Sequence, residues 1–233
     1  MATLIMAVMF YLGLRWQNEM HTPKGNRWLI LISFVVGLSF GVHFMGLLTI
    51  PAIGLLYYFK NYKTTTIKNF IVANVTGVAI LLFVFKLLAP NILHYFSALE
   101  IFFVNSVGLP FNSGSIIALV ILILFIYSGL KFTKRKGLVR LNTALLCVTF
   151  IVIGFTTWLM LPIRANANVP VNENNPSSAR ELLAYYNLEQ YPKTHLFYGP
   201  QFTDQYAGLD ENQPFTDDKP KYEKDLKNGK YVV

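Results

Sequence analysis

The sequence WLILISFVVGLSFGVHFMGLLTIPAIGLLYYF, residues 28–59, contains no Asp, Glu, Lys or Arg and is apolar along most of its length. As a single helix it would be about 48 Å long, which exceeds the roughly 30 Å hydrocarbon core of a bilayer. Its centre is rich in glycine and carries His43 and, further on, Pro51. We therefore predict two short helices, 28–41 and 44–59, that meet at a hinge. The hinge backbone must be shielded by protein or line a watery cavity.

Further apolar runs lie on both sides of this stretch. Three of them, 69–88, 114–132 and 141–161, are long enough for single spans, which need about 20 residues. The first run, 1–14, is shorter than that, and we interpret it as the end of a helix that begins outside this chain. The predicted membrane helices are therefore 1–14, 28–41, 44–59, 69–88, 114–132 and 141–161.

The composition is that of a membrane protein. Hydrophobic residues make up 54% of the chain and charged residues 14%, against about 25% charged residues in ordinary soluble domains. Residues 1–161 contain twelve Lys/Arg and two acidic residues, whereas residues 162–233 contain eight and ten. We predict an all-α polytopic membrane domain, 1–161, followed by a small soluble α/β tail, 162–233, which is the start of a larger domain.

The basic residues predict the orientation. They lie in the short loops 15–27, 60–68 and 131–140, which is the pattern of membrane topology and not of a nucleic-acid-binding face. All three loops fall on the same, cytoplasmic side only if 28–59 is a hairpin. The hinge, the tail and an interfacial helix over about 91–106 then lie on the outer face. Lipid, including anionic lipid at the basic loops, is the predicted partner, and nucleic acid is not.

The tail predicts a small α/β unit. Asn175 and Pro176 have the character of a helix start, with a capping residue followed by proline at the first helical position. We predict a helix from there to about Leu188, a strand over 194–198 and a loop over 204–229.

Four residues are candidates for a binding site. His43 is an ionisable group in an apolar stretch, and such groups in membranes are often functional, although it could also bond a neighbouring helix. Arg164 follows the last span, where it could bind a phosphate or simply extend to the interface. Glu173 and Asn174 could line a pocket, or belong to a turn.

Other residues have plainer interpretations. Cys147 is the single cysteine and is interpreted as a packing residue, while His94 and Glu100 are interpreted as interfacial surface. The sequence has no phosphate-binding glycine loop, no metal-ligand pair at helical spacing and no serine elbow, so we predict neither a metal nor a cofactor. Since Glu100 is the only acidic residue predicted on the outer side of the membrane half, a carboxylate base has few candidates in this chain.

Five segments together resemble a known family. They are GLSFGVHFMGLLTIPAIGLLYYFK (37–60), LPIRANANVPVNENNP (161–176), LEQY (188–191), FYGP (197–200) and YEKDLKNGKYVV (222–233). In order and spacing they resemble the bacterial protein O-mannosyltransferase-like membrane family, long catalogued as a domain of unknown function and placed in the GT-C glycosyltransferase superfamily.

The resemblance implies a reaction and a location. Such enzymes move a sugar, typically mannose, from a polyprenyl-phosphate carrier to a protein Ser/Thr hydroxyl on the outer, periplasmic face of the bacterial cytoplasmic membrane. The superfamily's key acid lies in the first outer loop, in an acidic segment that has no match in this sequence. The resemblance therefore implies an internal fragment whose catalytic base lies upstream.

The resemblance also gives the four candidates possible roles. His43 would contact the donor phosphate or sugar, Arg164 would steady the phosphate, and Glu173 and Asn174 would border the acceptor cleft. Two other functions stay open from the sequence. One is a non-catalytic membrane scaffold that binds a partner through its tail. The other is a transporter, because broken helices also build transport sites, although no inverted repeat is present.

Overall fold

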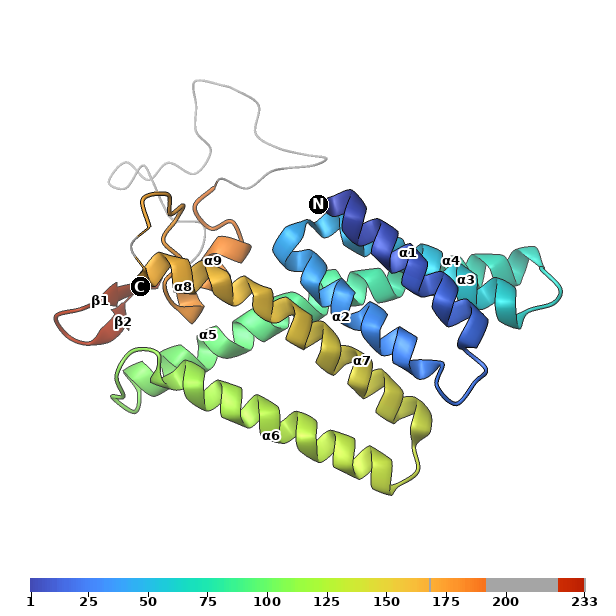
Figure 1. Cartoon of the computed structure of the whole chain (residues 1–233). Coiled ribbons are helices and arrows are strands. Elements are labelled where there is room, and N and C mark those ends of the chain that lie inside the picture. Colours follow the sequence, from blue (N-terminus) through green and yellow to red (C-terminus); the bar gives the residue numbers. More distant parts are fainter. Residues whose placement is uncertain (168, 192–221, 233) are drawn as a thin grey trace.

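The computed structural model describes residues 1–167, 169–191 and 222–232. Figure 1 shows a set of helices followed by a short tail with a small hairpin. The elements are α1 (Ala2–Glu19), α2 (Asn26–Val42), the 3₁₀ turn η1 (Phe44–Leu48), α3 (Thr49–Asn61), α4 (Ile67–Leu82), the π-helical turn η2 (Phe83–Leu88), α5 (Ala89–Asn105), α6 (Ser113–Arg135), α7 (Val139–Phe155), the 3₁₀ turn η3 (Thr156–Leu159), α8 (Met160–Asn166), α9 (Ala179–Tyr186), β1 (Glu223–Asp225) and β2 (Lys230–Val232).

Three continuous helical runs in the described residues are long and apolar enough to cross a membrane, namely Ile67–Asn105, Ser113–Arg135 and Val139–Asn166. At most 17% of the most apolar part of each run is buried inside the chain, so most of these side chains need another apolar environment. The structure thus confirms the fold class, an all-α membrane domain with a small tail. The interfacial position expected for α5 stays a prediction, since α5 continues directly from α4 through η2.

The predicted hinge is present at His43. This residue ends α2 and begins η1 in an extended conformation, with φ −170° and ψ 132°. Its Nδ1 atom accepts a hydrogen bond of 3.1 Å from the Met45 backbone N–H, so the side chain caps the following turn. On the other side of the break, the Trp158 indole N–H donates to the Phe40 carbonyl over 2.8 Å. Side chains therefore satisfy polar backbone groups that the broken helix leaves unpaired.

Helices α2 and α7 cross at two glycines. A Cβ atom built at Gly37 would lie 2.2 Å from the Ile151 carbonyl oxygen, and one at Gly154 would lie 2.3 Å from the Phe34 carbonyl oxygen. Real Cβ atoms do not approach so closely, so the two backbones can meet at this point only because both residues lack a side chain. This crossing fixes the hinge against the last spanning helix.

The three basic loops lie at one end of the helices, on the right in Figure 1, whereas α8, α9 and the hairpin lie at the other end. Hydrogen bonds join neighbouring elements at the basic end. Asn26 donates to Thr143 over 3.2 Å, and Asn61 donates to the Met20 sulfur over 3.2 Å. This arrangement requires residues 28–59 to turn back on themselves. Which side of a membrane this end faces stays a prediction.

The interpretation of Glu100 as a surface residue is wrong. Its side chain is fully buried, and its carboxylate accepts hydrogen bonds from the backbone N–H groups of Asn112 (2.5 Å) and Ser115 (2.8 Å) and from the Ser115 hydroxyl (2.9 Å). These donors belong to the start of α6, where helical N–H groups have no partner within the helix. Glu100 thus caps α6 from α5, and its negative charge faces the positive end of the helix dipole.

Replacing Glu100 with glutamine is expected to lower the free energy of unfolding by about 2–3 kcal/mol, because the amide NH₂ cannot accept from the α6 N–H groups and leaves buried donors unpaired. Unfolding in detergent, followed by circular dichroism, measures this loss. Ser115→Ala, which removes one hydroxyl bond and leaves the backbone bonds, is the matched control and should cost about 1 kcal/mol or less. Equal stability of Glu100→Gln and the wild type would contradict the capping role.

The tail helix starts later than predicted. Asn175 has a positive φ of 39°, and α9 begins at Ala179 with Ser178 as its cap. The Ser178 hydroxyl accepts from the Glu181 N–H, and the Glu181 carboxylate in turn accepts from the Ser177 N–H and hydroxyl. This reciprocal pairing resembles a capping box, and the helix begins there instead of at Asn175-Pro176.

The predicted loop over 204–229 is also partly wrong. Strand β1 lies within the described end of this range, strand β2 follows directly after it, and the two pair as an antiparallel hairpin. The hairpin is fixed to the membrane domain. The Asn105 side chain bonds both the N–H and the carbonyl of Tyr231 at 2.8 Å, and the buried Tyr231 hydroxyl donates to Glu100 over 3.4 Å. The strand predicted over 194–198 lies outside the described residues.

Candidate functional site

A cavity of about 950 Å³ lies beside the hinge, at the end of the helices opposite the basic loops. We call it the hinge cavity. It is bounded by the α2–η1 break, the π-helical turn η2, η3 with the start of α8, and the tail around α9. Its polar or ionisable lining residues are His43, Lys86, Thr157, Glu173, Tyr185, Tyr186, Asn187 and Tyr191.

His43 lines this cavity with a defined tautomer. Because Nδ1 accepts the Met45 N–H, it carries no proton, and the neutral ring must carry its proton on Nε2. His43 is exposed, so Nε2–H is a hydrogen-bond donor that a ligand in the cavity can use. His43 thus caps η1 through Nδ1 and presents its Nε2–H to the cavity.

Lys86 is a residue of the cavity that the sequence reasoning missed. It lies in η2, is exposed, and its ammonium stands 5.3 Å from the centre of the Phe85 ring. A signal for it existed in the sequence, because Lys86 is the one basic residue of 1–161 that lies outside the three basic loops. Ionisable residues within spanning helices are often functional, and π-helical turns are often found at functional sites.

Glu173 enters the cavity from the tail. Its carboxylate accepts a hydrogen bond of 2.7 Å from the Tyr191 hydroxyl, which also lines the cavity. This bond to Glu173 raises the pKa of Tyr191 above its ordinary value, because a carboxylate stabilises the protonated phenol. The tail therefore contributes a fixed acceptor opposite the donors of the membrane helices.

The remaining wall of the cavity is aromatic. Phe44 packs edge-on against Phe85 with ring centres 5.4 Å apart, and Trp158 packs against Tyr186 at 5.4 Å. The Tyr186 hydroxyl donates to the Phe85 carbonyl over 3.1 Å, which ties α9 to the π-helical turn. Aromatic walls with a few placed polar groups are typical of a site for a small organic ligand.

The structure brings two of the four predicted site residues together. His43 and Glu173 line the hinge cavity, although 130 positions separate them in the sequence. Arg164 is an exposed residue of α8, and Asn174 is exposed with a positive φ of 56°; neither lines this cavity. Within the described ranges, no three His, Cys, Asp or Glu side chains converge in a way that could hold a metal ion.

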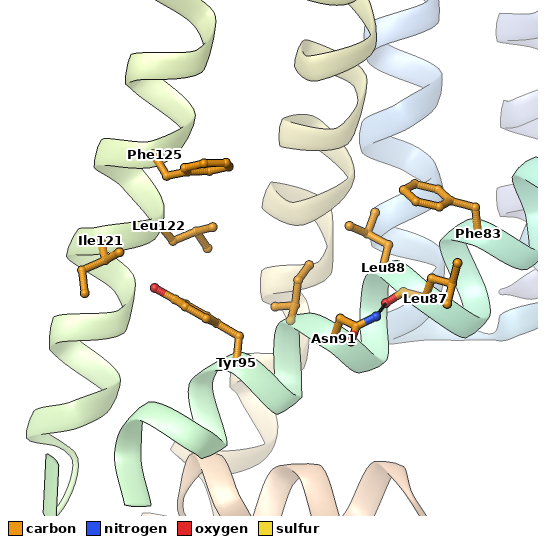
Figure 2. A pocket seen from close by; sticks show the side chains of 9 residues that line it. Phe83, Leu87, Leu88, Asn91, Tyr95, Ile121, Leu122 and Phe125 are labelled. Carbon is orange, nitrogen blue, oxygen red and sulfur yellow. Dashed lines mark hydrogen bonds between the residues drawn. The ribbon is translucent and has the colours of Figure 1, made fainter. Parts of the chain in front are cut away.

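A second cavity, of about 520 Å³, is an apolar groove between α5 and α6. Figure 2 shows Leu122 and Phe125 pointing from α6 toward α5, and Tyr95 pointing from α5 toward α6. Its polar groups are internally bonded, since Asn91 donates to the Leu87 carbonyl and Tyr95 to the Ala118 carbonyl. The groove thus offers an almost wholly hydrocarbon surface. Residues of η2 line both the groove and the hinge cavity.

Comparison with known proteins gives two partial matches. Residues 1–66 match the family described as "Protein O-mannosyl-transferase TMEM260 N-terminal domain". Residues 192–233 match a family of unknown function, DUF8416. No curated protein and no solved structure matches this chain. The first match contains α1, α2, η1 and α3, and therefore the hinge with His43.

Proposed function

We propose that this protein belongs to a bacterial GT-C-type glycosyltransferase that moves a sugar, typically mannose, from a polyprenyl-phosphate carrier to Ser/Thr hydroxyls of proteins on the outer face of the cytoplasmic membrane. The observation that carries the proposal is the hinge cavity, where His43, Lys86 and Glu173 converge from three distant parts of the sequence. The likeness of residues 1–66 to an O-mannosyltransferase domain supports the same reaction class.

The donor phosphate suits the basic side of the cavity. As the sugar–phosphate bond breaks, negative charge gathers on the departing lipid phosphate, and cationic or hydrogen-bonding donors must stabilise it. The Lys86 ammonium supplies a full positive charge, and His43 supplies its Nε2–H. In this proposal the apolar carrier chain lies in the groove between α5 and α6. Residues of the same π-helical turn also line this groove.

The acceptor suits the tail side. A hydroxyl that attacks the anomeric carbon must lose its proton to a base, usually a carboxylate. Under the proposal, Glu173 borders the acceptor cleft, and the base is the outer-loop acid of the resembled family, which has no match in this sequence. Arg164 and Asn174 stay proposals for the outer rim, where an exposed guanidinium can meet phosphates at the membrane surface.

The variant His43→Asn tests the donor role. Asparagine can still accept the Met45 N–H through Oδ1, because it is a favoured capping residue, but its shorter side chain does not place an N–H where the His43 Nε2–H lies. We expect normal expression and folding with donor affinity reduced about tenfold, the value of one hydrogen bond to a charged group. Binding of polyprenyl-phosphate mannose to the reconstituted protein measures this. Wild-type affinity of a folded His43→Asn protein removes His43 from the site.

Sugar transfer itself is tested in membranes, with polyprenyl-phosphate mannose and a Ser/Thr-rich acceptor. The chain and a form extended upstream are compared side by side. Transfer by the extended form that depends on His43 supports the enzyme. A protein that binds no donor and transfers nothing, while well folded in both forms, favours the scaffold.

A further inference from the structure

Leu188, just after α9, has a backbone conformation that glycine adopts far more readily. Its φ is 54°, in the left-handed region, where the Cβ atom of any other residue crowds the backbone. Its side chain lines the hinge cavity and is 60% exposed, so a ligand in the cavity can reach it. The chain thus accepts a backbone cost at this position and presents an apolar side chain there.

Hydrogen bonds at the end of α9 fix this conformation. The Leu188 N–H donates to the Tyr185 carbonyl over 3.3 Å, and the Glu189 N–H donates to the Ala184 carbonyl over 3.0 Å. These two bonds define the Schellman motif, in which the residue at the place of Leu188 is usually glycine. Arg180 in turn binds the Glu189 carboxylate through two nitrogens, at 3.3 and 2.7 Å, and both side chains are at most 8% exposed. A buried ion pair therefore holds the residue that follows Leu188.

The position of Leu188 indicates what its side chain contacts. Glycine would form the same motif without strain, and strained backbone of this kind is often found at functional sites. The Tyr191 N–H donates to the Leu188 carbonyl over 3.1 Å, and the Tyr191 hydroxyl donates to Glu173 over 2.7 Å. All three residues line the hinge cavity. Leu188 therefore belongs to the part of the cavity wall that the proposed function assigns to the acceptor.

We propose that Leu188 determines acceptor specificity, through contact with an apolar side chain close to the target Ser/Thr hydroxyl of the acceptor protein. This inference rests on the proposed function, in which the acceptor binds on the tail side of the hinge cavity. The apolar carrier chain has its own groove between α5 and α6, and Leu188 does not line that groove. Contact between two apolar side chains removes both from water, which favours an acceptor with leucine over one with alanine at the contacting position.

The test uses acceptor peptides with one target threonine in an alanine background and one leucine placed in turn at each flanking position. Mannose transfer by the extended form gives kcat/KM for each peptide. We expect leucine at one or two of these positions to raise kcat/KM about five- to tenfold, the value of partly burying a leucine side chain. Leu188→Gly should bring this ratio to about one. It should melt no lower than the wild type, because glycine adopts the left-handed conformation without strain.

Two further variants are controls. Leu188→Met keeps an apolar side chain of similar size and should retain the preference. Leu226→Ala removes a leucine that is 79% exposed in the tail hairpin and does not line the hinge cavity, and it should also retain the preference.

Several results would overturn the inference. If the wild type glycosylates the all-alanine peptide as well as every leucine peptide, the acceptor role of Leu188 fails and the proposed function stands. If it glycosylates no peptide, the proposed function fails and this inference fails with it. A Leu188→Gly protein that keeps the preference, or that melts lower than the wild type, also contradicts the inference. If Leu188→Gly instead loses affinity for polyprenyl-phosphate mannose, Leu188 contacts the donor and not the acceptor.

Discussion

Lys86→Met is expected to reduce sugar transfer by about 10²–10³-fold, the loss that follows removal of one group placed to stabilise developing negative charge. Methionine keeps the length and apolar stem of lysine and removes the ammonium, which lies 5.3 Å from the centre of the neighbouring Phe85 ring. The measurement is the initial rate of mannose transfer by the extended form in reconstituted membranes, at saturating acceptor, with donor concentration varied.

Two controls separate the charge from its surroundings. Lys86→Arg retains a cation that can bind phosphate and should keep a substantial part of the activity. Lys68→Met removes a lysine from the end of the basic loop 60–68, where the same helical run begins, and should leave transfer unchanged. If Lys86→Met transfers sugar at the wild-type rate, the hinge cavity is not the donor site. If Lys68→Met loses as much as Lys86→Met, the effect is one of membrane insertion.

Lys86 also shows what sequence reasoning can and cannot reach. Length and composition predicted the three long apolar runs and the break at His43, because a bilayer imposes a minimum length and a broken helix needs polar or small residues at its centre. The same reasoning interpreted Lys86 as part of a spanning run. Its place in the hinge cavity depends on α9, which the Tyr186–Phe85 hydrogen bond joins to η2, and on Glu173, which lines the same cavity; no local pattern encodes this arrangement.

Glu100 and the tail show the same limit. The sequence around Glu100 is amphipathic and aromatic, which suits an interface, but the carboxylate is buried because α6 begins directly against α5 and needs a cap. In the tail, Asn175-Pro176 is a sound local signal, yet the Ser178–Glu181 pair gives more hydrogen bonds three residues later. In both cases hydrogen bonds decide the structure against the local sequence pattern. For Glu100 the partners are on another helix, and for the tail helix they are a few residues further along the chain.

Gly154→Ala is expected to destabilise the protein by about 3 kcal/mol or more, at the upper end of the cost of overpacking a well-packed interface. The new methyl group would lie 2.3 Å from the Phe34 carbonyl oxygen and 2.7 Å from the Leu38 nitrogen, and both are backbone atoms that cannot move aside cheaply. Gly37→Ala, on the facing side of the crossing, should behave alike. Because each glycine relieves the same contact, the double variant should cost less than the sum of the two.

Gly129→Ala is the matched control, since its added methyl would meet only the flexible tip of Leu145, 2.9 Å away. Within a helix, alanine in place of glycine should there be neutral or stabilising by up to about 1 kcal/mol. Unfolding of the purified protein in detergent measures all four variants. If Gly154→Ala is as stable as Gly129→Ala, the close crossing of α2 and α7 is wrong.

The crossing also bears on the hinge cavity. Phe155, next to Gly154, packs edge-on against Phe40 at 5.1 Å, and Trp158 bonds the Phe40 carbonyl at the end of α2. Separating α2 from α7 would therefore displace the segment that leads into His43. We expect any Gly154→Ala protein that still folds to bind polyprenyl-phosphate mannose about as weakly as His43→Asn does, although it retains every cavity side chain. Wild-type donor affinity in that protein would show that the site does not depend on the α2–α7 crossing.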